Sequence, residues 1–195
     1  MKNVGMTDNG IIYKLPGKMV FTGSNNIDTG IHLFRDYDSF TLFSDVEFNA
    51  EDQIIDDASK PATIISCMWE AEPYPGFTYR IRNNAGIYIT DIIFGTDMVN
   101  IVPNAKGKYR IKMAFSVENR TIKNIFYQVN DADLKSFALS YEFQVSGTIE
   151  NAILTLGSYR KTSGAYGRYF IGDMNQFILY DRAFSNEEIN MFFNS

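Results

Sequence analysis

Aromatic and basic residues gather in one glycine-containing stretch near the C-terminal end of the sequence. Tyr159, Arg160, Tyr166 and Arg168 fall close together, and two glycines interrupt the segment 160–168. Aromatic rings can cover the apolar C–H faces of sugars, and arginine donates charge-assisted hydrogen bonds to oxygen acceptors. The composition of this loop therefore predicts a carbohydrate-binding site.

A second pair of aromatic residues surrounds a proline-rich turn. Trp69 is the only tryptophan, and Tyr74 follows it between Pro73 and Pro75. The two prolines restrict the backbone around Tyr74 and favour an exposed ring. We therefore expect Trp69 and Tyr74 to contribute to sugar binding. The competing interpretation, which stays open at this point, places Trp69 in the core.

The acidic residues lack a pattern typical of glycoside hydrolysis, which uses two carboxylates beside the scissile bond. Glu70 and Glu72 are two positions apart, but no third acid continues the spacing. The single histidine, His32, is expected at the edge of a strand. One histidine and one cysteine also fall short of the usual ligand sets of zinc. We therefore expect a protein without catalytic activity.

The composition argues against several other classes of protein. The chain has 195 residues and a net charge of −5, and it has no lysine and arginine cluster that would favour nucleic acid. Its apolar runs are too short to insert into a membrane. No signal peptide is visible at the N-terminus. Cys67 lies in an apolar run and is expected to be a buried thiol. An extracellular or virion-surface location is favoured, although an intracellular one stays open.

Short alternating segments with turn residues between them follow one another along the chain. Residues 40–48, for example, carry apolar side chains on one face and mostly polar ones on the other. Residues 174–180 are apolar on both faces, which is typical of a strand in the middle of a sheet. Ser185 and Glu188 form a capping box before a short helical turn. This pattern predicts an antiparallel β-sandwich.

The closing segment also resembles a known family. Arg182-Ala183-Phe184-Ser185 and Glu187-Glu188-Ile189 match the end of the laminin-G-like jelly rolls in the concanavalin A-like lectin/glucanase superfamily. Residues 127–134 are similar to another block of that family, with Asp131 where a glycine is usual. The resemblance runs from about Met19 to Phe193. It implies an all-β, two-sheet antiparallel jelly roll, with one domain over residues 1–195 and residues 1–10 as an arm.

The resemblance implies a non-catalytic module that recognises a surface glycan. The Glu-x-Asp-x-Glu motif of the related β-glucanases is absent. Many family members bind Ca²⁺ through hard oxygen ligands, and the candidates here are Asp28 and Asp173. The module would serve adhesion, as part of a phage tail, baseplate or head fibre. The alternative is a structural domain that contacts other virion or surface proteins without binding sugar.

Overall fold

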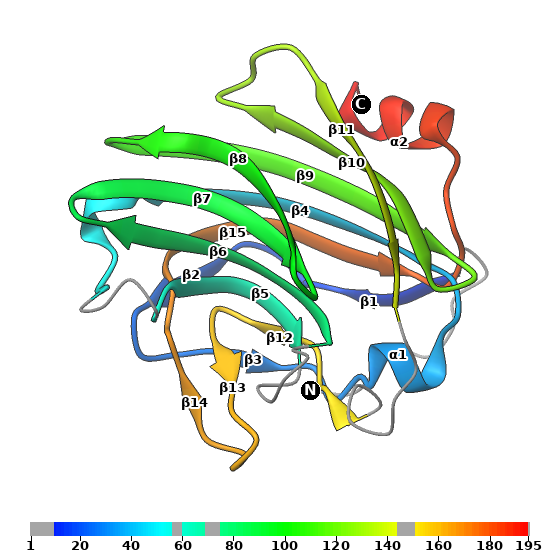
Figure 1. Cartoon of the computed structure of the whole chain (residues 1–195), viewed down its shortest axis with the longest axis horizontal. Helices are drawn as coiled ribbons and strands as arrows, with labels where there is room; N and C mark the ends of the chain where they lie inside the picture. The colour runs from blue at the N-terminus through cyan, green and yellow to red at the C-terminus, as the bar shows by residue number, and fades with distance from the viewer. Residues whose placement is uncertain (1–9, 56–59, 69–74, 144–150, 195) are drawn as a thin grey trace.

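The computed structural model describes residues 10–55, 60–68, 75–143 and 151–194, which form a sandwich of two antiparallel β-sheets (Figure 1). This arrangement confirms the predicted all-β jelly roll. In the described part of the chain, the first sheet has the order β1 (Ile11–Lys14), β15 (Ile171–Tyr180), β4 (Phe40–Asn49), β9 (Lys108–Glu118), β10 (Thr121–Val129) and β11 (Lys135–Glu142), with β2 (Met19–Thr22) also paired to β15.

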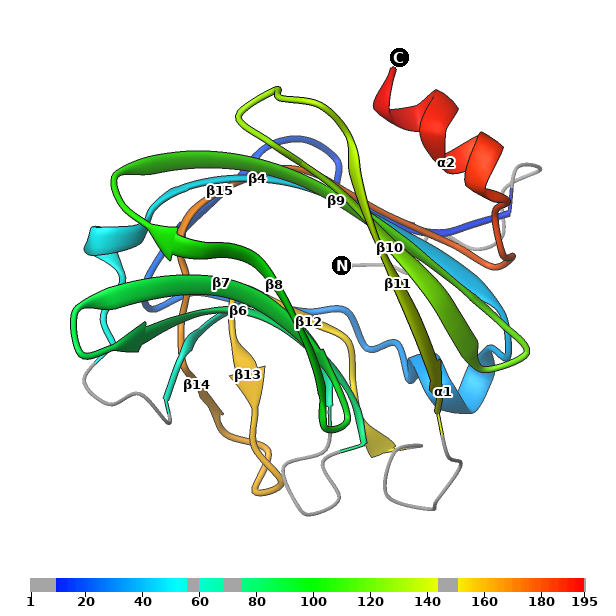
Figure 2. The same cartoon turned by 45° about the horizontal axis from the view of Figure 1, so that its top comes forward.

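The second sheet packs against the first. Its order is β3 (Ile27–Asp28), β12 (Thr155–Leu156), β5 (Ala62–Met68), β6 (Gly76–Asn84), β7 (Ile87–Phe94) and β8 (Asp97–Ala105). A two-stranded hairpin, β13 (Tyr159–Arg160) and β14 (Tyr166–Gly167), follows β12. The figures place this hairpin on the side of the sandwich opposite the C-terminal helix (Figures 1 and 2).

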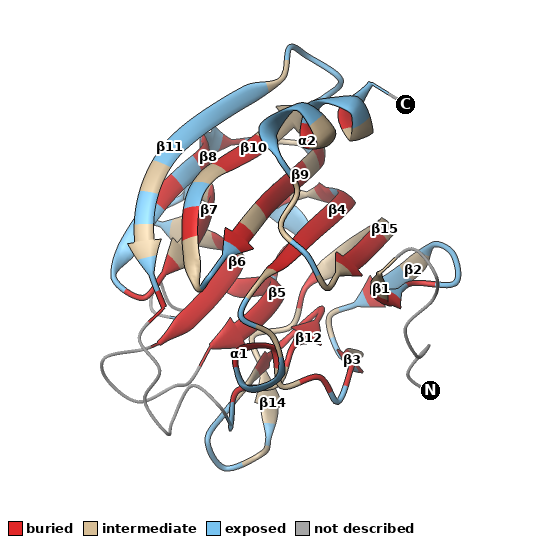
Figure 3. Cartoon of the chain, turned by 90° about the vertical axis from the view of Figure 1, so that its right-hand side faces the viewer, coloured by how far each residue is buried: buried red, intermediate tan, exposed pale blue. Residues whose placement is uncertain are grey.

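Side chains that alternate along each strand build the core between the sheets. On β4, Phe40, Leu42 and Val46 point into it and are fully buried. The middle strands are buried along much of their length, whereas the edge strand β11 is largely exposed (Figure 3). Cys67 is also fully buried, and burial raises the pKa of its thiol to about 12. The predicted buried thiol is therefore confirmed.

The C-terminal helix α2 (Asn186–Phe193) covers part of the outer face of the first sheet (Figure 2). Its capping box forms as predicted: the Glu188 N–H donates to Ser185 Oγ at 3.3 Å, and the Ser185 N–H donates to a Glu188 carboxylate oxygen at 2.9 Å. Ile189 and Phe193 pack against Phe43 and Ile178 of the sheet. β15 therefore lies between two apolar layers, which explains why its sequence is apolar on both faces.

Some local expectations were wrong. His32 precedes the short helix α1 (Leu33–Asp36) instead of lying at a strand edge. A 3₁₀ turn, η1 (Ala50–Asp52), follows β4. The strand β11 pairs with β10 from Lys135 to Glu142. Among the described residues, no helix is long and apolar enough to span a membrane.

Candidate functional site

The hairpin β13–β14 contains most of the residues that the sequence singled out. Arg160 lies directly opposite Tyr166, and Tyr159 lies opposite Gly167. Two backbone hydrogen bonds close its turn: the Lys161 N–H donates to Ala165 O at 2.8 Å, and the Gly164 N–H donates to Lys161 O at 2.9 Å. Gly164 has a φ of +83°, which a glycine adopts without strain.

The base of the hairpin is fixed to β5. The Gly157 N–H donates to Ile64 O at 2.8 Å, and the Thr63 N–H donates to Arg168 O at 2.7 Å. Gly157 has a φ of +76°, and a Cβ there would lie 2.1 Å from the ring of buried Phe21. The hairpin therefore rises from a closely packed base.

The ring of Tyr159 packs against the side chain of Arg168. The Tyr159 side chain is buried, and the Arg168 guanidinium carbon lies 4.6 Å from the centre of its ring. A cation over an aromatic face is attracted to the ring electrons. The predicted sugar-stacking role of Tyr159 is untested, but in this geometry the ring face is occupied by Arg168 instead of being open to a ligand.

Tyr166 contacts the nearest carboxylate. Its hydroxyl donates a hydrogen bond to Asp28, whose other carboxylate oxygen accepts from the Gly30 N–H at 2.9 Å. Burial, and then the hydrogen bond to Asp28, raise the pKa of Tyr166, while neighbouring Arg160 opposes the shift. Asp28 therefore forms a hydrogen bond with the hairpin, although the two lie far apart in the sequence.

Two recesses flank the hairpin and share Lys161. The larger has a volume of about 360 Å³ and is lined by Gly23, Ile54, Lys60, Lys161, Gly167, Arg168 and Tyr169. The smaller is lined by Ser66, Met68, Asn151, Ala152, Ile153, Arg160 and Lys161. The described lining of both recesses contains cations and no carboxylate. An acidic chain therefore has one locally basic surface here.

The side chain of Arg160 is partly buried beside the smaller recess. Its Nε is buried and has no hydrogen-bond partner among the described residues. A buried donor without an acceptor is costly, and a guanidinium is suited to pairing with a carboxylate through two parallel hydrogen bonds. The smaller recess, at about 10 Å³, is too small to admit a ligand to this buried nitrogen, so Arg160 contributes to the surface through the charge of its guanidinium.

The structure separates the other predicted site residues from this surface. Asp173 lies on β15 of the first sheet and forms an ion pair with Lys18 at 2.6 Å. Among the described residues, no group of three or more His, Cys, Asp or Glu side chains is placed to hold a metal ion. Asp28 and Asp173 lie in different sheets, on β3 and β15, and the calcium site remains a prediction. Trp69 and Tyr74 lie outside the described residues.

Sequence reasoning missed two residues of this surface, Lys60 and Lys161. Lys161 could have been found, because it follows Arg160 in the loop already singled out. Lys60 gave no local signal. It reaches the larger recess only because the segment before β5 lies beside the base of the hairpin.

Comparison with known proteins gives matches at the level of structure only. No protein-family model matches the sequence, and no curated protein does either. The Ruminococcus gnavus IT-sialidase CBM40 bound to α2,6-sialyllactose is similar, with a TM-score of 0.58 and 12% identity over 92% of this chain and 97% of that chain. The K499G mutant of the Streptococcus pneumoniae NanB sialidase has a TM-score of 0.58 and 14% identity.

These matches establish the class of fold. A leech intramolecular trans-sialidase complexed with 2,7-anhydro-Neu5Ac is also similar, with a TM-score of 0.56 and 12% identity. This chain spans 28% of the length of the pneumococcal and leech chains. At these identities the matches show the fold alone: an antiparallel two-sheet jelly-roll sandwich, as the sequence predicted.

Proposed function

We propose that this protein is a non-catalytic module that binds a glycan bearing a carboxylate, through the hairpin β13–β14 and the larger recess beside it. The observation that carries the proposal is the basic lining of that recess, by Lys60, Lys161 and Arg168, without a carboxylate among its described residues, and with Arg160 beside it on β13. We call these four side chains the hairpin cations. On a chain of net charge −5, such a local excess of positive charge favours an anionic ligand.

The chemistry of the site suits an acidic sugar in particular. Arg160, opposite Tyr166 on the hairpin, adds a guanidinium charge, and such a group pairs well with a carboxylate. Tyr169 lines the larger recess and provides an aromatic edge beside the lysines. The R. gnavus module of similar fold was solved with sialyllactose, a sugar that carries a carboxylate. The likeness supports the proposed class of ligand, while the named residues carry the argument for this chain.

A role in adhesion follows from this proposal. The larger recess has no carboxylate pair in its described lining, so it provides no acid and base for glycoside hydrolysis. A binding module without such groups serves by holding a larger assembly at a glycan-coated surface. We therefore propose an extracellular or virion-surface location, with the parent assembly, such as a phage fibre, as its protein partner.

Isothermal titration calorimetry with 3′-sialyllactose and with lactose tests the proposal. We expect the wild-type protein to prefer 3′-sialyllactose, because only that sugar carries a carboxylate. The double variant Lys60→Gln/Lys161→Gln should lose about tenfold or more of this preference, since a charge-assisted hydrogen bond contributes roughly 1.5–3 kcal/mol.

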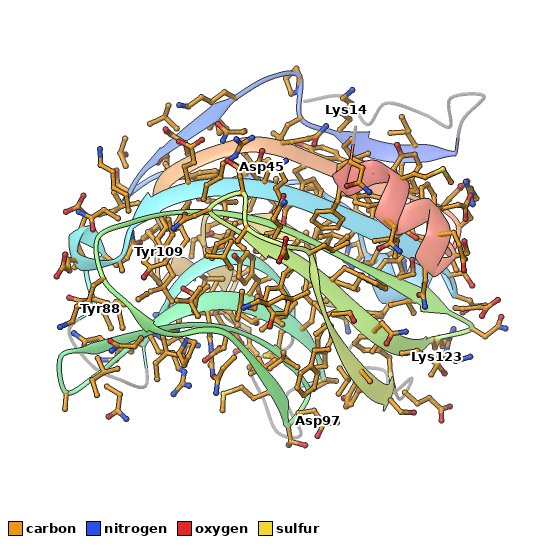
Figure 4. The ribbon with its side chains drawn as sticks, turned by 90° about the horizontal axis from the view of Figure 1, so that it is seen from above. Lys14, Asp45, Tyr88, Asp97, Tyr109 and Lys123 are labelled. Atoms are coloured by element: carbon orange, nitrogen blue, oxygen red, sulfur yellow. The ribbon has the colours of Figure 1, made fainter. Side chains whose placement is uncertain are left out.

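Lys123→Gln is the matched control, because Lys123 is an exposed lysine on β10 of the other sheet (Figure 4). It should bind both sugars as the wild type does. Equal affinity of the wild type for the two sugars, or an unchanged preference in the double variant, would contradict the proposal.

A further inference from the structure

A second hollow lies at one end of the first sheet, where β4 ends and β9 and β15 begin. It has a volume of about 470 Å³, within the roughly 300–1,000 Å³ range of small-molecule sites. We call it the first-sheet groove. Its lining consists of Val20, Phe21, Glu47, Phe48, Asn49, Asp52, Lys108, Tyr109, Arg110, Asn130, Ile171, Gly172 and Asp173. Figure 4 labels Tyr109, near the start of β9, and Asp45, on the adjacent strand β4.

The groove carries charges of both signs, in contrast to the described lining of the hairpin recesses. Its carboxylates belong to Glu47, Asp52 and Asp173, and its cations to Lys108 and Arg110. Lys18 compensates Asp173 through an ion pair of 2.6 Å. An ionic ligand of either sign would therefore meet like charges as well as opposite ones. The groove favours a ligand without net charge.

One pair of opposed side chains in the groove destabilises the sheet. Glu47 and Asp173 lie directly opposite each other on β4 and β15, and like charges at opposed positions destabilise a sheet. Neighbours hold the pair in place: Asn175 donates to Glu47 at 2.8 Å, and Arg110 lies 3.8 Å from it. Two carboxylates kept together on an open face provide several acceptors for ligand hydroxyl groups.

The remaining lining residues offer hydrogen-bonding groups and an apolar surface to a sugar ring. Asn49 and Asn130 provide amide groups that both donate and accept, and Lys108 provides donors. Val20 is 54% exposed and, with Ile171, offers an apolar surface to C–H groups. Each hydroxyl of a sugar donates one hydrogen bond and accepts others, so mixed donors and acceptors satisfy it.

We propose that the first-sheet groove is a second binding site, which takes a neutral, polyhydroxylated sugar unit. This inference goes beyond the proposed function, because it concerns a different hollow and a ligand without a carboxylate. The two hollows adjoin, because Ile171 of the groove would lie 3.0 Å from a Cβ on Gly23 of the larger recess. Together they would hold an acidic and a neutral unit of one glycan.

The experiment uses ligand-observed NMR and calorimetry on the whole chain with lactose, maltotriose and cellotriose as probes. We expect at least one of them to bind with a Kd of about 10 mM or lower. Val20→Trp places a bulky ring in the groove from an exposed position and should weaken that binding by about tenfold or more. Ile87→Trp is the matched control, because Ile87 is also exposed, at 48%, but lies on β7 of the second sheet.

Two results would overturn the inference: absence of binding by all three sugars, or equal binding by the wild type and Val20→Trp. Lys60→Gln/Lys161→Gln separates this inference from the proposed function. It should leave binding of the neutral sugar unchanged while it removes the preference for 3′-sialyllactose. If Val20→Trp instead removes that preference and leaves neutral binding intact, the assignment of the groove is wrong.

Discussion

The hairpin β13–β14 and the first-sheet groove are both polar surfaces, but their charges are held in different ways. In the recesses of the hairpin, the described lining contains cations and no carboxylate. In the groove, Arg110 and neighbouring carboxylates compensate one another across adjacent strands. The described lining of the hairpin recesses is therefore cationic, whereas several charges of the groove are paired within the protein. The difference predicts that one surface selects by charge and the other by the pattern of hydroxyl groups.

The two surfaces also depend on different parts of the fold. The hairpin rises from a packed glycine at the end of β12, so its position depends on a few backbone contacts. The groove lies on β4, β9 and β15, which pair along most of their length. Variants that act on the base of the hairpin and on the charges of the groove can therefore separate the two.

The largest expected effect comes from Gly157→Ala. The added Cβ would lie 2.1 Å from the Phe21 ring, on a backbone with φ of +76°. Overpacking and strain together should lower the free energy of unfolding by about 3 kcal/mol. Urea denaturation measures this change.

Gly164→Ala is the control for Gly157→Ala, because Gly164 has a similar φ of +83° but its Cβ would meet only Arg160 Nη2, at 4.0 Å. Its loss should be about 1 kcal/mol. Equal losses for the two variants would show that Phe21 does not fix the base of the hairpin.

A smaller effect is expected from Arg110→Ala in the groove. Arg110 forms two hydrogen bonds with the mostly buried Asp45 carboxylate, at 3.1 and 2.7 Å. The hydrogen bond to Asp45 also raises the pKa of Arg110, so the pair stays charged. Removal of the guanidinium leaves that carboxylate without its partner and should cost about 2 kcal/mol of unfolding free energy.

Lys18→Ala is the comparison for Arg110→Ala, because the Lys18 side chain is 52% exposed in its ion pair with Asp173. Exposed ion pairs contribute about 0–1 kcal/mol, so thermal unfolding should change little. A loss for Lys18→Ala as large as that for Arg110→Ala would remove the distinction between the two pairs.

The smallest expected effect concerns the protonation of the Tyr166 hydroxyl on the hairpin. Because the folded pKa of Tyr166 is raised above its ordinary value of 10.0, its hydrogen bond to Asp28 stabilises the hairpin below pH 10. This contribution is lost as the pH rises through the raised pKa. NMR titration of labelled tyrosine should therefore place Tyr166 above 10.0.

Asp28→Asn should lower the pKa of Tyr166 only in part, because burial is the larger cause of the shift. Tyr141, whose pKa is raised mainly by burial on β11, is the internal reference and should not respond. An unchanged Tyr166 titration in Asp28→Asn would show that the carboxylate does not act on the hydroxyl.

The sequence by itself determined the class of fold, central strands such as β4 and β15, and the last helix. These features depend on local patterns: side chains alternate along β4, β15 is apolar on both faces, and Ser185 and Glu188 cap α2. The same local reading identified Arg160, Tyr166 and Arg168, because they lie together in one short loop. Asp131 replaced the expected glycine without loss of the turn, since Asn130 and Asp131 both adopt positive φ, of 51° and 55°.

Only the tertiary structure decided which distant residues meet. Asp28 reaches Tyr166 across 138 positions of sequence, and Lys60 joins Lys161 in one recess. The pairing of Glu47 with Asp173 likewise depends on the register of β4 and β15. The physical reason is that the order and register of strands arise from burial of the whole core between two sheets. A local sequence pattern states which face of a strand is apolar but not which strand lies beside it.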